Sequence, residues 1–100
     1  MTERAEADLA EIWAYLAAEA SETVADRVVN AAYAAYEPLR EFPMLGAQRP
    51  QFARGLRVVF SGGYAIYYIS DDVSVIVVRV LHGSRDAAAI AEHGGFAGEA

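Results

Sequence analysis

Residues 56–81 have the composition of a small β-sheet and read LRVVFSGGYAIYYISDDVSVIVVRVL. β-Branched and aromatic residues fill three runs, at 56–61, 64–70 and 73–81, which is typical of strands. Gly62-Gly63 and Asp71-Asp72 separate the runs, and both pairs favour tight turns. The stretch therefore predicts a three-stranded antiparallel β-meander over about residues 56–82.

The last of these strands is apolar on both sides. Strict alternation divides its residues into two faces: Val75, Val77, Arg79 and Leu81 on one, and Ile76, Val78, Val80 and His82 on the other. A sheet with one wet face should alternate apolar and polar residues. Because a single helical layer covers only one face, the C-terminal tail, a second copy or a different protein must cover part of the other. This pattern favours a binding partner.

Upstream of the meander, the periodicity is helical. Leu9, Ile12, Trp13 and Leu16 are spaced i, i+3, i+4 and i+7, which predicts an amphipathic helix over about residues 4–19. Ser21 and Thr23 are N-cap candidates for a second helix, and Pro38 predicts a kink or a short break near its end. The predicted helical core consists of Leu9, Ile12, Trp13, Leu16, Val28, Val29 and Leu39.

These elements predict a single α+β domain over residues 1–100. An N-terminal helical hairpin, about residues 4–41, packs on the meander, and Pro43, Gly46 and Pro50 mark the loop between them. The tail at 83–100 contains a short helix near residues 86–92. One hundred residues leave no room for a second core.

Charge and composition narrow the functional classes. Residues 1–41 hold nine acids and three arginines, whereas residues 42–86 hold five arginines and three acids, on a chain of net charge −6. An acidic chain is a poor general nucleic-acid binder, but a locally cationic half suits an acidic peptide partner. There is no cysteine, and no apolar run approaches the ~18 residues of a membrane span. We expect a cytoplasmic protein that does not contact membranes.

Five residues of the sheet half stand out as candidates for chemistry: Arg57, Tyr64, Arg79, His82 and Arg85. Arg79, within an apolar strand, either forms a structural ion pair, with Asp86 or Asp72, or grips a carboxylate or phosphate of a ligand. His82 is either a general acid or base at a strand end or a turn residue that bonds to backbone groups. No residue cluster predicts a metal site or a cofactor site.

The chain resembles ParE-like toxins of the RelE/ParE superfamily over roughly residues 5–90. The resemblance begins with Ala7-Asp8-Leu9, Ile12-Trp13 and Tyr15 in the first helix. It continues in the family's order through Phe42-Pro43, Leu45-Gly46, Arg49-Pro50, Gly55-Leu56-Arg57, Tyr64-Ala65-Ile66, Tyr68 and the run from Arg79 to Asp86. The family usually has a β-strand before this helix, so that strand is predicted to be absent or vestigial here.

The resemblance implies the toxin of a type II toxin–antitoxin pair. A ParD-like antitoxin, with an acidic, amphipathic C-terminal segment, would neutralise it, and DNA gyrase would be its target. Operator DNA would be reached only through the antitoxin. On this reading the residues that bind antitoxin or target are Arg57, Tyr64, Tyr68, Arg79, His82 and Arg85.

Two alternatives stay open. The first is a RelE-like, ribosome-dependent mRNA endonuclease, for which only Arg57, Arg79, His82 and Arg85 could supply a catalytic site. The second is a degenerate module that captures an antitoxin without being toxic. The acidic balance of the chain and the lack of lysine favour a gyrase-binding protein over a nuclease.

Overall fold

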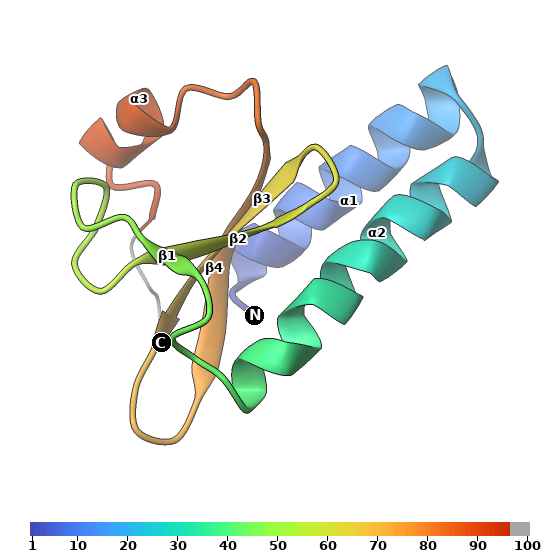
Figure 1. Cartoon of the computed structure of the whole chain (residues 1–100). Helices are drawn as coiled ribbons and strands as arrows, with labels where there is room; N and C mark the ends of the chain where they lie inside the picture. Colours follow the sequence, from blue (N-terminus) through green and yellow to red (C-terminus); the bar gives the residue numbers. More distant parts are fainter. Residues whose placement is uncertain (97–100) are drawn as a thin grey trace.

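The chain forms three layers (Figure 1), and the computed structural model describes residues 1–96. Helices α1 (Glu3–Glu19) and α2 (Glu22–Tyr36) form an antiparallel hairpin on one face of an antiparallel sheet. The sheet has the order β1-β2-β3-β4, with β1 at Ala47–Gln48, β2 at Arg57–Ser61, β3 at Tyr64–Ser70 and β4 at Val75–His82. Helix α3 (Ala87–Glu92) lies on the other face. The predicted α+β class is confirmed.

Both long helices begin at hydroxyl caps. The Thr2 side chain accepts a hydrogen bond from the Ala5 amide, and Ser21, rather than Thr23, accepts one from the Val24 amide. The break predicted at Pro38 is present, because α2 ends at Tyr36 and continues as a 3-10 turn, η1 (Glu37–Arg40).

The helical layer packs on the sheet around a core that includes the predicted Leu9 and Leu39, both buried. The other predicted helical core residues are half-buried, and two of them, Ile12 and Val29, pack against this core; the set is Ile12, Trp13, Leu16, Val28 and Val29. The indole N–H of Trp13 donates a 2.8 Å hydrogen bond to Asp26 and joins the two helices.

The sheet has four strands rather than the predicted three. β2, β3 and β4 form the expected meander, but Ala47 and Gln48 add a short fourth strand that pairs with Val58 and Arg57 of β2. The sequence did not predict β1, because it has only two residues, both exposed, and two positions are too few to show an alternating apolar pattern. Within residues 1–96 no strand precedes α1; of the two residues before the helix, Thr2 donates hydrogen bonds to the Val77 and Val78 carbonyls of β4.

A β-bulge corrects the predicted faces of the last strand. Tyr68 pairs with Val77 and Tyr67 with Arg79, so Val78 is an extra residue in β4. Val77 and Val80 therefore both face the helical hairpin, whereas Val78 and Leu81 both face the opposite layer. Strict alternation wrongly placed Val77 with Leu81 and Val78 with Val80, because an apolar run gives no sign of the inserted residue.

The part of the second face around β4 is covered by the chain itself. Val78 and Leu81 are 1% and 3% exposed, beneath α3 and Phe96. The Phe96 ring stacks on Phe52 at 5.7 Å and tilts against Tyr67 at 4.6 Å. Of the three covers that the sequence allowed, the tail is the one present. The last strand therefore needs no partner to bury its second face, and the argument for a partner drawn from that strand was wrong; Phe60 of β2 stays 62% exposed.

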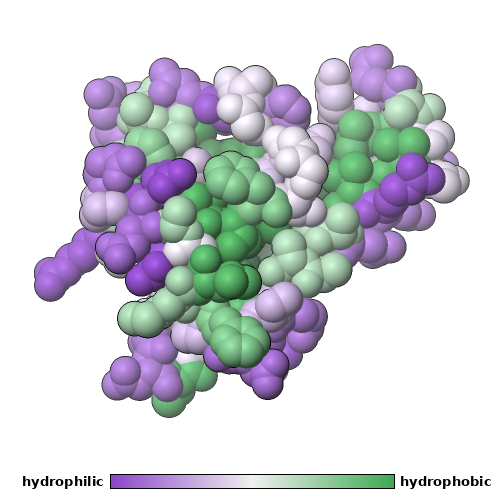
Figure 2. Space-filling view, in the orientation of Figure 1, coloured by the Kyte–Doolittle hydropathy of each residue, from purple (hydrophilic) through white to green (hydrophobic). Residues whose placement is uncertain are grey.

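Exposed apolar side chains remain elsewhere. Figure 2 shows a hydrophobic area at the centre of the displayed face, where Figure 1 places the loop between η1 and β1. Phe42, Met44 and Leu45 of that loop are all more than half exposed, at 61%, 75% and 62%. The domain thus presents apolar surface on this loop, and also at Phe60 of β2, which is 62% exposed.

Candidate functional site

A groove of about 370 Å³ lies between α1 and the end of β4. It collects three of the six predicted binding residues, Tyr64, His82 and Arg85, on one side of the molecule. Ile12 and Tyr15 of α1 form the opposite wall, and Tyr15 is 65% exposed. The remaining lining residues are Asp8, Glu11, Val80, Leu81 and Ser84. The groove is therefore apolar at its walls and carries charge at its rim.

His82 is held in one orientation at this groove. Its Nδ1 accepts a 3.1 Å hydrogen bond from the Ser84 amide and lies 2.7 Å from the Ser84 hydroxyl. Because Nδ1 is an acceptor, the neutral imidazole carries its proton on Nε2. The ring meets the Tyr64 ring edge-on at a centroid distance of 5.2 Å. The turn interpretation of His82 is thus confirmed, and Nε2–H stays available as a donor.

Backbone groups of β4 also face the groove. The Val80 N–H points away from β3, because it donates to Asp8 at 3.0 Å. A residue of an antiparallel strand directs its N–H and C=O to the same side, and the side reverses at each residue. The Val80 carbonyl and the His82 N–H are therefore directed to the open edge beside Tyr64 and Tyr15. This edge can accept an added extended peptide.

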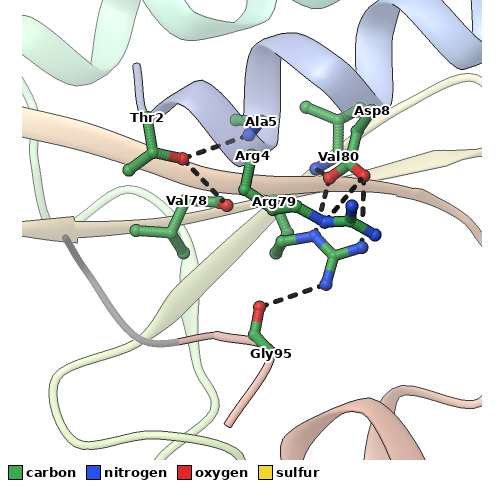
Figure 3. A network of polar contacts seen from close by, with 8 residues as sticks. All are labelled: Thr2, Arg4, Ala5, Asp8, Val78, Arg79, Val80 and Gly95. Atoms are coloured by element: carbon green, nitrogen blue, oxygen red, sulfur yellow. Dashed lines mark hydrogen bonds and ion pairs between the residues drawn. The ribbon is translucent and has the colours of Figure 1, made fainter.

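Arg79 belongs to a buried network rather than to the groove (Figure 3). It is 4% exposed, and its Nε and Nη2 donate to the two carboxylate oxygens of Asp8, at 2.7 and 3.1 Å. Its Nη1 donates to the Gly95 carbonyl at 3.1 Å. The predicted structural ion pair is present, but its partner is Asp8 and not Asp86 or Asp72. Asp86 instead caps α3, and Asp72 lies exposed in the β3–β4 turn.

Tyr68 and Arg57 are also engaged inside the chain. The Tyr68 side chain is fully buried, and its hydroxyl accepts from the Gly46 amide and donates to the Pro43 carbonyl, both at 2.8 Å. Gly46 is required there because a Cβ would lie 2.7 Å from that hydroxyl. Arg57 donates to the Gly46 carbonyl at 2.8 Å. Both residues fasten the loop that carries the exposed apolar side chains to the sheet.

The four residues suggested for a nuclease do not converge. Arg57 lies on β2 and His82 on β4, and β3 lies between these strands. Arg57 pairs with Tyr68 of β3, whereas His82 pairs with Tyr64 at the other end of β3. Strand spacing and rise separate the two Cα atoms by roughly 16 Å. Arg79 is saturated by Asp8, which leaves His82 and Arg85 together at the groove. Within residues 1–96 no cluster of His, Cys, Asp or Glu has the form of a metal site.

Sequence reasoning missed two residues that organise this region, Asp8 and Thr2. Asp8 is 4% exposed and accepts from both Arg79 and the β4 backbone. A signal was present, since Asp8 follows Ala5 by three positions and precedes Ile12 by four, which puts it on the buried stripe of the helix. An acid on an apolar stripe requires a buried partner.

The fold is shared with a solved structure. The chain is similar to a structure described as the chromosomal ParDE TA system from P. aeruginosa, with a TM-score of 0.71 and 20% sequence identity. The match covers 81% of this chain and 89% of that one. No match was found among curated proteins.

The sequence itself gives the family. Residues 1–87 match the family described as ParE toxin of type II toxin-antitoxin system, parDE. The chain belongs to this family, and the resemblance noted in the sequence is confirmed. Most of α3 and all of the segment that carries Gly95 and Phe96 lie beyond the matched residues.

Proposed function

We propose that this chain is a toxin neutralised by a ParD-like antitoxin that binds in the groove between α1 and β4. The observation that carries the proposal is the convergence of Tyr64, His82 and Arg85 beside the open edge of β4. Ile12 and Tyr15 offer apolar contact, and the strand edge offers backbone hydrogen bonds. An amphipathic segment matches the apolar walls, and an acidic side chain on it can meet Arg85 at one end of the groove, away from Glu11 on α1.

DNA gyrase is the proposed target. The family membership supports a toxin, and the dispersal of Arg57, Arg79 and His82 argues against an improvised ribonuclease site. The exposed Phe42, Met44 and Leu45 provide a second surface, separate from the groove, that a large protein target can contact. A gyrase target places the toxin in the cytoplasm; no helix among residues 1–96 has the length and apolarity to cross a bilayer.

Growth and enzyme assays test the toxin and its target together. Induced alone in a bacterial host, the chain should arrest growth, and co-expression of the antitoxin encoded beside it should restore growth. Purified protein should inhibit supercoiling of relaxed plasmid by gyrase and leave ribosome-bound messages intact. Codon-specific cleavage of messages would establish the endonuclease instead, and normal growth would establish a degenerate antitoxin-binding module.

The groove is tested by Tyr15→Ala. Tyrosines are enriched among the few interface residues whose truncation costs about 2 kcal/mol or more, so with Tyr15 as such an anchor antitoxin affinity should fall by roughly 30-fold in isothermal titration calorimetry. Tyr33→Ala is the matched control, because Tyr33 is a 46% exposed tyrosine on α2 that does not line the groove. Equal losses for both variants, or none for either, would place the antitoxin elsewhere.

A further inference from the structure

A second pocket, of about 280 Å³, lies beyond the edge of β4 between α1 and α3. Four cationic or basic side chains line it: Arg4 from α1, Arg79 from β4, Arg85 from the loop after β4, and His93 after α3. Small and apolar positions, Ala89, Ile90 and Gly95, complete the lining, and none of the lining residues is acidic. Three of the eight arginines of an acidic chain thus meet at one place.

The charges at this pocket are only partly compensated. Asp8 lies behind it and neutralises Arg79 through two hydrogen bonds. Its third hydrogen bond comes from the Val80 amide, so the carboxylate has little capacity left for Arg4, whose Nε is 3.8 Å away. Arg4 is 55% exposed, and Arg85 forms no ion pair with any of the described residues. Counting only residues 1–96, three arginines and Asp8 leave two uncompensated positive charges at the pocket before any contribution from His93.

The chemistry of the pocket selects a compact anion. Guanidinium groups bind carboxylates through paired hydrogen bonds, and this pocket can present two of them from different elements. An extended polyanion such as nucleic acid is disfavoured, because α1 also exposes Glu3, Glu6 and Glu11 and the chain carries −6 overall. A single carboxylate fits this pocket because no acidic residue lines it, whereas Glu11 lines the neighbouring groove.

We infer that this pocket binds an acidic side chain of the antitoxin segment that occupies the neighbouring groove. Arg85 lines both sites, so the pocket adjoins the groove on the α3 side of the β4 edge. A peptide anchored on Ile12 and Tyr15 would carry an Asp or Glu a few residues along to Arg4 and Arg85. This inference rests on the proposed function for its ligand, whereas the anion affinity of the pocket does not depend on toxicity.

The first test uses the isolated protein and a small anion. Sodium acetate added at constant ionic strength should shift the Nε–Hε NMR signals of Arg4 and Arg85 in a saturable way, with sodium chloride as the reference. The Arg27 signal should not shift, because Arg27 is an exposed arginine of α2 that lines neither site. Equal responses of all three arginines, or none, would overturn the inference even where the chain arrests growth.

The second test uses the complex with the antitoxin. Arg4→Gln should weaken antitoxin binding at least tenfold, since a charge-assisted hydrogen bond to a carboxylate is lost. Arg27→Gln should leave the affinity unchanged. The thermal midpoint of each free variant identifies any loss of folding, and Arg85→Gln provides a second variant from a different element. Tight antitoxin binding that is insensitive to both Arg4→Gln and Arg85→Gln would refute the inference while the proposed function stands.

Discussion

Asp8→Ala should destabilise the domain by about 3–5 kcal/mol, because it leaves the buried guanidinium of Arg79 without its counter-charge. The same change removes the acceptor of the Val80 amide at the sheet edge. A loss of this size is a large fraction of the ~5–15 kcal/mol by which domains are stable. Urea denaturation followed by circular dichroism measures it.

Two further variants distinguish the loss of the ion pair from a general effect of removing an acidic residue from α1. Glu11→Ala changes an exposed acid one turn later in α1 and should alter stability by less than about 0.5 kcal/mol. In the double variant with Asp8→Leu and Arg79→Met, apolar groups replace both charges, and most of the loss should be recovered. A single variant as stable as the parent, or a double variant no better than Asp8→Ala, would contradict a buried, mutually dependent pair.

Phe96→Ala should cost about 3 kcal/mol and expose the second face of the sheet. The ring is 1% exposed and lies between Phe52 and Tyr67, so its removal leaves a cavity between the sheet and the layer that contains α3. Helix α3 has six residues, too few to persist without packing. We expect the amides of α3 to lose hydrogen-exchange protection while those of β3 keep it, since the tail can open locally.

Phe42→Ala is the matched control for Phe96→Ala, because it removes the same aromatic ring from an exposed position. Phe42 is 61% exposed on the loop between η1 and β1, and its removal should change stability by no more than about 0.5 kcal/mol. Binding of a hydrophobic dye should rise for Phe96→Ala only, because Val78 and Leu81 lie beneath the tail. Full protection of α3 in Phe96→Ala would show that Ile90 and the Arg79–Gly95 bond hold the tail without the ring.

Local patterns in the sequence were sufficient for most of the fold. The helical spacing of Leu9, Ile12 and Leu16, the break at Pro38 and the glycine turn at 62–63 act over a few residues, and the structure shows each of them. The bulge at Val78 could not be predicted, because apolar residues on both sides of it hide the change of register. The cover of the second face depends on how Phe96 returns to the sheet, which no local pattern records.

The site was predicted in part for the same reason. Tyr64, His82 and Arg85 lie near one another in the groove, as the end of a strand and the turn after it suggest. Arg79 was separated from its partner by 71 positions, so its ion pair with Asp8 was not visible in the local sequence. Tyr68 was selected for its place in a family motif, whereas its hydroxyl serves the loop at Pro43 and Gly46.

The bonds between α1 and β4 imply an order of events during synthesis. Thr2 and Asp8 bond to residues 76 and 71 positions later, so the start of α1 has no partner until β4 has been made. Contacts of such long sequence separation slow folding, and a ribosome adding 5–20 residues per second needs roughly 4–14 s to bridge the interval. One wall of the groove comes from α1, which is made first, and the other comes from β4 and the residues after it, which are made last. A nascent chain that has not reached residue 85 therefore cannot form the groove, and this chain acquires it only late in its translation.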